Sequence, residues 1–488
     1  MAWCGFAGGD CILAVSNSIV SEDKKLISRK KGLISAMAKG KYLTAPIASE
    51  KMPAGVPYIL CNEASERFSF YGMRCILVIF MTKYLLGADG VLAPMGAEQS
   101  KAYFHLFVSA VYFMPLVGAL LCDIWLGKYR TILYFSLIYC LGFLALSLDN
   151  TRVGLATGLI LIAIGSGVIK PCVSANVGDQ FGKSNKHLIE KVYGWFYFAI
   201  NFGAFISQLL IPVMLDRYNP RVAFAIPAAF MFLATLAFWM GRSKFVHIPA
   251  AGLKFVKEVF SGEGLKALVK LCIIYLFVAM FWALFDQMDS AWVLQAEKMN
   301  RYWLGHEWLS AQIVAVNPLM IMILIPAFSF VIYPSINKVF PMTALRKISI
   351  GLFVASSVFV VSALIETRIS GGAKPSIGWM ILAYLLLTSA EVMVSITCLE
   401  FSYTQAPKKM KSFIMAVFLL SISLGNAFTA AVNAFIRNED GSSKLEGASY
   451  FWFFTIMMAV TAVIFIFVAM GYREKTYIQD EELAEYGA

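Results

Sequence analysis

The stretch that decides the fold runs from Val56 to Leu86 and reads VPYILCNEASERFSFYGMRCILVIFMTKYLL. It is long and apolar enough to cross a bilayer, because a spanning helix needs about 20 mostly apolar residues. It nevertheless carries Glu63, Glu66, Arg67 and Arg74. A charge at the centre of a spanning helix costs about 2.5–3.5 kcal/mol on insertion scales, so several such charges indicate a polar cavity where something charged is bound.

These charges share one face of the predicted helix. At 100° per residue a single stripe holds five side chains, those of Glu63, Glu66, Arg67, Phe70 and Arg74. Two carboxylates beside two guanidiniums form a coupled titrating unit, since arginine stays charged while a buried carboxylate can take up a proton. The alternative is an ion-pair network that serves only helix packing. A surplus of arginine and lysine around a cavity favours the functional interpretation.

The composition extends the membrane interpretation to the whole chain. Hydrophobic residues make up 59% of 488, charged residues only 15%, and the mean hydropathy is +0.71. These values predict an all-α, polytopic membrane protein. We place twelve spanning helices near 56–86, 101–122, 130–148, 153–173, 190–214, 222–241, 269–295, 311–334, 342–365, 377–405, 410–436 and 448–471. Within these segments Lys170, Asp286 and Glu391 add three further charges.

The net charge of +11 follows from topology. Basic residues gather in every second loop, as in the pairs Lys24 and Lys25, Lys128 and Arg130, Lys183 and Lys186, Lys254 and Lys257, Arg346 and Lys347, and Lys408 and Lys409. This positive-inside bias places both termini in the cytoplasm of a cell that carries the protein in its plasma or inner membrane. We therefore expect no nucleic-acid partner.

No cofactor or metal is expected. The nine cysteines lie mostly within spans and show no CxxC spacing, so they behave as small apolar residues without disulfides. The four histidines are too dispersed to form a metal cluster. The first fifty residues lack the apolar core of a cleavable signal peptide, so 1–51 is either a cytoplasmic tail or an over-extended start.

One polar interruption divides the chain into equal halves. Residues 242–268 alternate charged and apolar side chains as an amphipathic helix on the cytoplasmic surface does. We expect six-helix bundles over 52–241 and 269–472, a short cytoplasmic tail over 473–488, and binding sites near the midplane between the bundles.

Several motifs resemble those of one transporter family. GALLCDIWLGKYR (118–130) resembles the loop motif of the major facilitator superfamily, in which glycines permit close helix approach and Asp123 and the basic residues latch helix ends. EASERFSFYG (63–72) resembles the ExxER signature of the proton-dependent oligopeptide transporter (POT/PTR) family. Further segments agree in order: GSGVIKPCVSA (165–175) with GDQF (178–181), FYFAINFG (196–203), FWALFDQ (281–287) and EFSYTQAP (400–407). The resemblance covers roughly residues 52–472 and implies a major facilitator fold of two six-helix bundles.

The resemblance also implies a set of proton-coupling residues. Glu63 and Glu66 would be the coupling acids, with Arg67 and Lys170 as their switching partners. Asp286 and His105 match family positions that take part in proton uptake, and histidine titrates near physiological pH. A lone histidine beside aromatic residues is also consistent with a packed donor.

A second set would bind the peptide. Lys170, with Arg67 and Arg74, suits the C-terminal carboxylate of a peptide, and Glu391 in the other half suits its amine. Asn201 and Asn317 would help Glu391. Aromatic residues would form side-chain pockets, although any of them could be simple bundle packing; these are Tyr71, Tyr112, Tyr197 and Trp282.

Three positions depart from the family pattern. Phe70 stands where many members have tyrosine, Phe418 where tryptophan is common, and Asp289 adds an unusual second carboxylate one turn beyond Asp286. These departures bear on peptide preference and on proton number.

We interpret the chain as a proton-coupled symporter that imports di- and tripeptides by alternating access, is no enzyme, and functions as a monomer. The first alternative is a transporter of nitrate or another small organic ion. The second is a peptide sensor that binds without net transport. Glu391 suits an amine, and nitrate has no amine, so the presence of this acid favours peptides over nitrate.

Overall fold

A computed structural model of the chain describes residues 42–46, 48–250, 252, 262–405 and 411–472. Its first half forms α2 (Val56–Lys83), α3 (Ala97–Leu121), η1 (Cys122–Leu126), α4 (Lys128–Leu148), α5 (Arg152–Asp179), η2 (Lys183–Leu188), α6 (Ile189–Arg217), α7 (Pro220–Met240) and η3 (Gly241–Ser243), where η marks a short 3₁₀ or π turn.

The second half continues from α9 to α17. Its elements are α9 (Gly262–Phe285), η4 (Asp286–Asp289), α10 (Ala291–Glu297), β1 (Tyr302–Trp303), β2 (His306–Glu307), η5 (Ser310–Ala315), α11 (Val316–Ala327), η6 (Phe328–Ile332), α12 (Tyr333–Asn337), α13 (Ala344–Ser370), α14 (Gly378–Glu391), η7 (Val392–Ile396), α15 (Thr397–Gln405), α16 (Lys411–Ile436) and α17 (Ala448–Gly471). The two strands pair as a small antiparallel hairpin in an otherwise helical protein.

The described residues contain twelve long helical segments that cross the molecule, in agreement with the twelve predicted. Eleven segments within the described residues are long and apolar enough to span a membrane. Helix α2 is the twelfth. It is 28 residues long, but it carries too many charged residues to be recognised as a span by apolar composition alone. Helices are the expected solution, because inside a bilayer every backbone polar group must be bonded within the protein.

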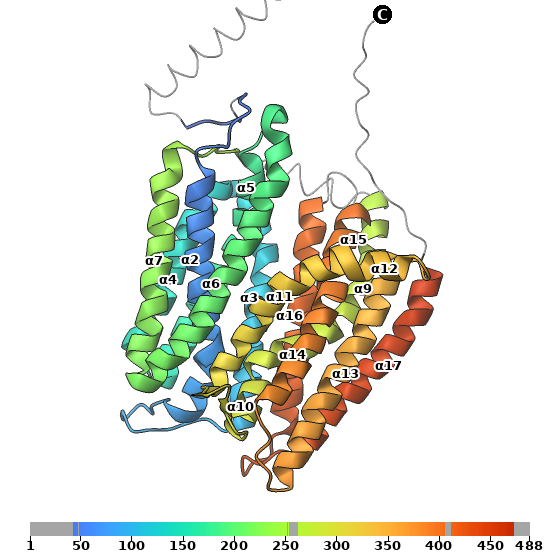
Figure 1. The fold of residues 1–488 in the computed structure, drawn as a ribbon. Coiled ribbons are helices and arrows are strands. Elements are labelled where there is room, and N and C mark those ends of the chain that lie inside the picture. The colour runs from blue at the N-terminus through green and yellow to red at the C-terminus, as the bar shows by residue number, and fades with distance from the viewer. Residues whose placement is uncertain (1–41, 47, 251, 253–261, 406–410, 473–488) are drawn as a thin grey trace, which may run out of the picture.

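The helices form two bundles that stand side by side (Figure 1). In one, α2 packs against α6 and α7, and α4 against α5 and α7; in the other, α13 packs against α14 and α17, and α9 against α16. The bundles meet where α3 packs against α16 and where α6 packs against α11 and η5. Part of the predicted amphipathic linker, residues 251 and 253–261, lies outside the described residues.

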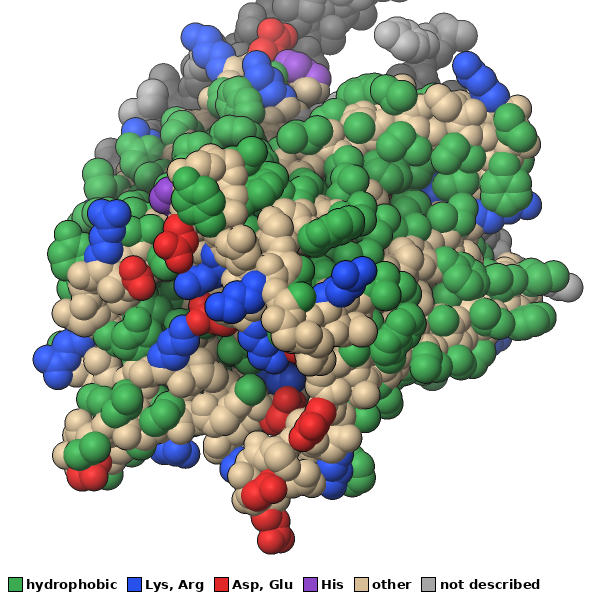
Figure 2. All heavy atoms as spheres, turned by 60° about the horizontal axis from the view of Figure 1, so that its bottom comes forward, with side chains coloured by type: hydrophobic (Ala, Val, Ile, Leu, Met, Phe, Trp, Pro, Cys, Tyr) green, Lys and Arg blue, Asp and Glu red, His purple; other side chains and the backbone are tan. Residues whose placement is uncertain are grey.

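The "termini end" is the end at which α2 begins and α17 ends, and the "far end" carries the loops 84–96, 298–309 and 437–447. Figure 2 brings the far end forward and shows acidic and basic side chains gathered on it.

Gly118 in the segment 118–130 permits the close helix approach that the sequence predicts, whereas the role of Gly127 was not predicted. A Cβ atom on Gly118 would lie 2.5 Å from the carbonyl oxygen of Val168, so glycine permits the contact between α3 and α5. Gly127 has a φ of 72°, a left-handed conformation that favours glycine. The ammonium of Lys128 bonds to Asp179 at the end of α5, at 2.5 Å, and thereby links two helices of the same bundle.

Candidate binding cavity and its charged residues

A cavity of about 660 Å³ lies between the bundles. Both bundles line it, the first through α2, α3, η1, α4, α5 and α6, the second through α9, η7, α15 and α16. It reaches the termini end, because Asp123 and Lys128 at the junction of α3 and α4 are among its walls. Its volume falls within the range of about 300–1,000 Å³ that is typical of small-ligand sites.

Five of the residues predicted to bind substrate line this cavity, namely Arg67, Tyr71, Tyr112, Lys170 and Trp282. Three positions of the motif-bearing helices that were not predicted also line it: Tyr193, Phe196 and Ser395. Phe418, which stands where relatives commonly have tryptophan, is another wall residue. Most of the lining is aromatic or apolar, so the few charged groups dominate its electrostatics.

The acids and the arginine of the ExxER segment pair within α2. The Nε of Arg67 lies 2.7 Å from Oε1 of Glu63 and 3.3 Å from Oε2 of Glu66. Both carboxylate side chains are only 3% exposed, whereas Arg67 is 12% exposed and reaches the cavity. The Ser166 hydroxyl of α5 lies 3.5 Å from Glu66. One guanidinium therefore faces two buried acids and the cavity at once.

Lys170 has no ion-pair partner among the described residues. Its Nζ is shielded from solvent, donates no hydrogen bond to a described residue, and lies 4.1 Å from the centre of the Phe70 ring. The ring of Tyr112 is 5.7 Å away. The predicted pairing of Lys170 with Glu63 or Glu66 is not formed in this conformation. An ammonium shielded from solvent in a cavity wall is thus contacted only by aromatic faces, which attract cations weakly.

Glu391 lies on the opposite bundle, at the end of α14. The π turn η7 follows it directly, and such turns are frequent at functional sites. Asn317 of α11 donates to Glu391 Oε2 at 2.9 Å and to the Thr388 hydroxyl at 3.1 Å. Asn201, by contrast, donates to the backbone oxygen of Tyr197 within α6. Of the two predicted amide helpers, only Asn317 contacts Glu391 here.

Arg74 belongs to a different cluster from Arg67. It bonds to Asp286 and lies 2.8 Å from Asp289, both in η4 of the other bundle, and it is only 2% exposed. His105 of α3 lies beside them, 2.7 Å from Asn426 Oδ1 and 2.9 Å from the Ser290 hydroxyl. Asn426 in turn donates to Asp286 at 2.5 Å. We call these six residues the far-end seal, because they join the bundles on the side of the cavity away from its opening.

The stripe that periodicity predicts along α2 is therefore divided between two clusters. Arg67 and its acids lie at the cavity, while Arg74 lies in the far-end seal and is not among the cavity walls. Asn426, Thr388 and Ser166 were not predicted. Small polar residues are common in packed spanning helices, so one sequence carries no signal that separates these three from the rest.

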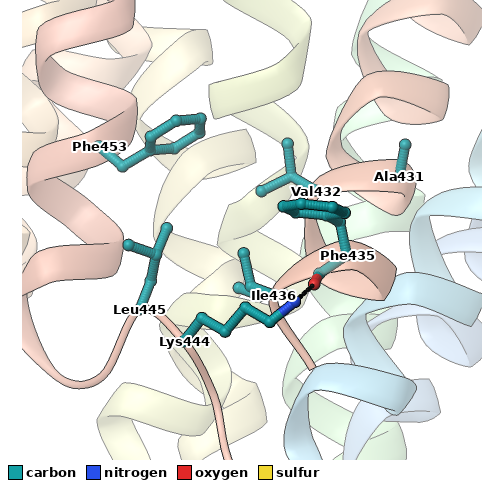
Figure 3. Close-up of a pocket in the computed structure, with 7 residues that line it drawn as sticks. All are labelled: Ala431, Val432, Phe435, Ile436, Lys444, Leu445 and Phe453. Carbon is teal, nitrogen blue, oxygen red and sulfur yellow. Dashed lines mark hydrogen bonds between the residues drawn. The ribbon is translucent and has the colours of Figure 1, made fainter. Parts of the chain in front are cut away.

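A second pocket lies elsewhere, between α16 and α17 near the far end. It measures about 590 Å³, and Figure 3 shows its apolar lining with Lys444 at one side. The Lys444 ammonium donates to the backbone oxygen of Phe435 at 2.9 Å and so already has a partner. No carboxylate lines this pocket, so it does not match the charges of a zwitterion. Among the described residues there is also no group of histidine, cysteine or acidic side chains suited to a metal.

The fold and the cavity define a class: a multi-pass membrane protein with two helical bundles around a central site. A model of the family described as "PTR2: POT family" matches residues 129–262 and 253–453. The chain belongs to the POT family, which confirms the predicted family and the predicted major facilitator fold.

Curated relatives agree with this assignment. Peptide transporter family 1 of Drosophila melanogaster is 34% identical over 368 residues, which are 66% of this chain and 48% of that protein. Solute carrier family 15 member 2 of Homo sapiens is 33% identical over 407 residues, 72% of this chain and 54% of that protein. The chain thus spans about half the length of the curated relatives it matches. These relatives are named as transporters or solute carriers, which agrees with the prediction that the chain is no enzyme.

Solved structures show the same fold. An auto-inhibited POT family peptide transporter superposes with a TM-score of 0.79 at 33% identity, over 88% of this chain and 99% of that one. The POT family transporter PepTSo gives a TM-score of 0.78 at 35% identity, over 86% of this chain and 99% of that one.

Proposed function

We propose that the protein is a proton-coupled symporter that imports di- and tripeptides by alternating access. The observation that carries this is the distribution of charge around the cavity. Arg67 and the unpaired Lys170 line the cavity from one bundle. Glu391 belongs to the other bundle, at the end of α14, and is not itself among the lining residues. A peptide has a carboxylate at one end and an ammonium at the other, so it complements both sides.

The peptide carboxylate would bind Lys170 and Arg67. Hydrogen bonds between charged groups are about twice as strong as neutral ones. The peptide amine would bind Glu391, whose orientation Asn317 holds at 2.9 Å. Tyr71 and Tyr197 of the first bundle lie near Glu391 and would flank the peptide backbone. Aromatic walls such as Trp282 would accept many side chains, because stacking and dispersion discriminate little between them.

Proton coupling would use the three charges of the ExxER segment. While Glu63 and Glu66 are ionised, they hold Arg67 at 2.7 and 3.3 Å. Protonation of either acid would release Arg67 to the peptide carboxylate, and loss of the proton would reclaim it. One proton supplies about 2.3 kcal/mol per 100 mV and about 1.4 kcal/mol per pH unit. Together these support a several-hundred-fold peptide gradient.

Alternating access would move the opening from one end to the other. The cavity reaches the termini end, and the far-end seal closes the opposite side. With the termini in the cytoplasm, as the basic loops indicate, this conformation faces inward. Opening outward would require the Arg74 ion pairs to separate. The bundles over 52–241 and 269–472 would move against each other about the linker 242–268, and one chain would suffice as the functional unit in the cell membrane.

Uptake into proteoliposomes tests the proposal. We expect labelled dialanine to accumulate when the outside is acid and the inside is buffered neutral. Accumulation should vanish in Glu66→Gln and in Glu391→Gln. Glu66→Gln should still exchange labelled for unlabelled peptide without a gradient, because it removes the proton site and not the peptide contacts.

Glu307→Gln is the matched control, because Glu307 is a 71% exposed acid outside the cavity. It should accumulate dialanine like the unmodified protein. Binding of dialanine without uptake would contradict the symporter and point to a sensor. If the protein neither binds dialanine nor takes it up, other small ions become the candidate substrates, with nitrate first.

A further inference from the structure

The far-end seal holds one permanent cation against two carboxylates. Arg74 of α2 contacts both Asp286 and Asp289 of η4. All three side chains are 3% exposed or less. If both carboxylates were ionised, the three groups would carry a net charge of −1 in a region nearly closed to water. An uncompensated buried charge is costly, so such a cluster favours the uptake of one proton.

The two carboxylates are not equivalent. Asp286 is bonded at both oxygens, by Arg74 at Oδ1 and by the Asn426 amide at Oδ2. Asp289 is completely buried, and among the described residues neither of its oxygens accepts a well-aligned hydrogen bond. Its nearest cation atom, Nε of Arg74, is equally without an aligned bond. Two aligned hydrogen bonds thus stabilise the ionised form of Asp286, whereas Asp289 has only the ion pair of its Oδ2 with Nε of Arg74 at 2.8 Å.

The other titratable groups around the seal do not supply a second cation to Asp289. Cys75 on α2 and Tyr384 on α14 lie near Asp289, and both are neutral weak acids. Tyr112 on α3 interacts with Arg74. His105 contacts neutral groups, Asn426 and Ser290, and so lacks a counter-charge of its own. The nearest lysine on α3, Lys101, is paired with Glu98 at 2.7 Å.

We propose that Asp289 binds a proton whenever the far end closes and releases it when that end opens. An O–H bond forms at the carboxylate while an O–H bond of a hydronium ion at the far end breaks and leaves a water molecule. In the open state, water would solvate the ionised carboxylate beside Arg74. In the closed state, the neutral acid leaves Arg74 and Asp286 as a balanced pair.

This site differs from the Glu63 and Glu66 unit, which lies at the cavity. Its consequence for transport rests on the proposed function, under which the far end faces outside. A low pH outside the cell would then favour closure of the far end and increase the inward-facing population. By linkage, one proton bound on closing changes the closed-to-open ratio by up to about tenfold per pH unit, with closure lost as the pH rises.

The first test reads the proton itself and needs no transport. Infrared difference spectra of the purified full chain between neutral and acid pH should contain the C=O band of a protonated buried carboxyl. Asp289→Asn should remove one component of that band, because the amide imitates the neutral acid in shape and cannot ionise. Glu98→Gln, which alters an acid of α3 outside the far-end seal, should keep it. A spectrum of Asp289→Asn that superimposes on that of the unmodified protein would overturn the proposal.

The second test measures closure. Spin labels at V91C and L304C, in a background without other cysteines, would report the distance between the bundles across the far end. Both positions are exposed, at 63% and 78%. The population with the short distance between the labels should grow on acidification. In Asp289→Asn, closure should take up one proton fewer, so this population should depend less steeply on pH.

An equal pH dependence in both proteins would overturn the proposal. It would also fail if His105→Asn, and not Asp289→Asn, removed the pH dependence, because the proton would then reside on His105. Both tests remain informative if dialanine uptake fails, so failure at Asp289 and failure of the symporter can be told apart.

Discussion

At the scale of single residues, the unpaired ammonium of Lys170 is the most consequential feature of the cavity. Lysines in membranes usually pair with an acid or extend to the interface. Lys170 instead lies over the Phe70 ring, and no described carboxylate is within ion-pair distance. A phenylalanine at position 70 offers no hydroxyl to bond the ammonium, so the amine keeps its bonding capacity for a ligand.

Lys170→Gln should therefore weaken dialanine binding by about ten- to a hundred-fold, because a hydrogen bond to a charged group is worth about 1.5–3 kcal/mol. Dialanine amide, which lacks the carboxylate, should bind both proteins equally. Calorimetry on the purified protein measures the four affinities. An equal loss for both ligands would show that Lys170 shapes the cavity and does not recognise the carboxylate.

At the scale of the helices, close packing depends on a few glycines. A Cβ atom at Gly118 would meet the backbone of Val168, which cannot move aside as a flexible side chain does. The pair α3 and α5 carries Tyr112 and Lys170 into the cavity, and α3 also carries His105 to the far-end seal. Their separation would disturb both sites at once.

Gly118→Ala should destabilise the protein by about 1–3 kcal/mol, as overpacking of a close contact does. The thermal unfolding temperature in detergent measures the effect. Gly96→Ala is the control, because Gly96 lies at the start of the same helix and a Cβ atom there meets nothing within 4 Å. A similar shift in both variants would show that the contact with Val168 is not limiting.

At the scale of the whole molecule, ion pairs of two kinds join the bundles at the far end. The pairs of Arg74 are almost fully buried. Lys83 pairs with Glu297 nearby but is 48% exposed. Removing one partner of a buried pair costs about 3–5 kcal/mol because the other charge is left unpaired. An exposed pair contributes only about 0–1 kcal/mol.

Arg74→Gln should consequently open the far end, and the closed-to-open ratio should fall at least about a hundred-fold. Lys83→Gln should change the ratio no more than about fivefold. The distance between labels at V91C and L304C measures both. If Lys83→Gln opens the molecule as far as Arg74→Gln, burial is not what gives the seal its strength.

The helices and the family could be predicted because their signals are local. The apolar segments and their breaks determine twelve spans, since each span must satisfy its own backbone in the bilayer. The ExxER segment needs no more than one helix, because Glu63 and Arg67 are one turn apart and meet at 2.7 Å. The acids that pair with Arg67 followed from the sequence alone.

What only the tertiary structure decided is which helix faces which. Periodicity assigns Arg74 to the same stripe as Arg67, yet Arg74 pairs with Asp286, 212 positions away. Likewise His105 meets Asn426, 321 positions away. In a bilayer all faces of a span are apolar apart from a few polar side chains, so hydrophobic pattern does not select partners. The partners are set by how closely the bundles pack, and that packing leaves Lys170 free at the cavity and Asp289 sharing a single guanidinium.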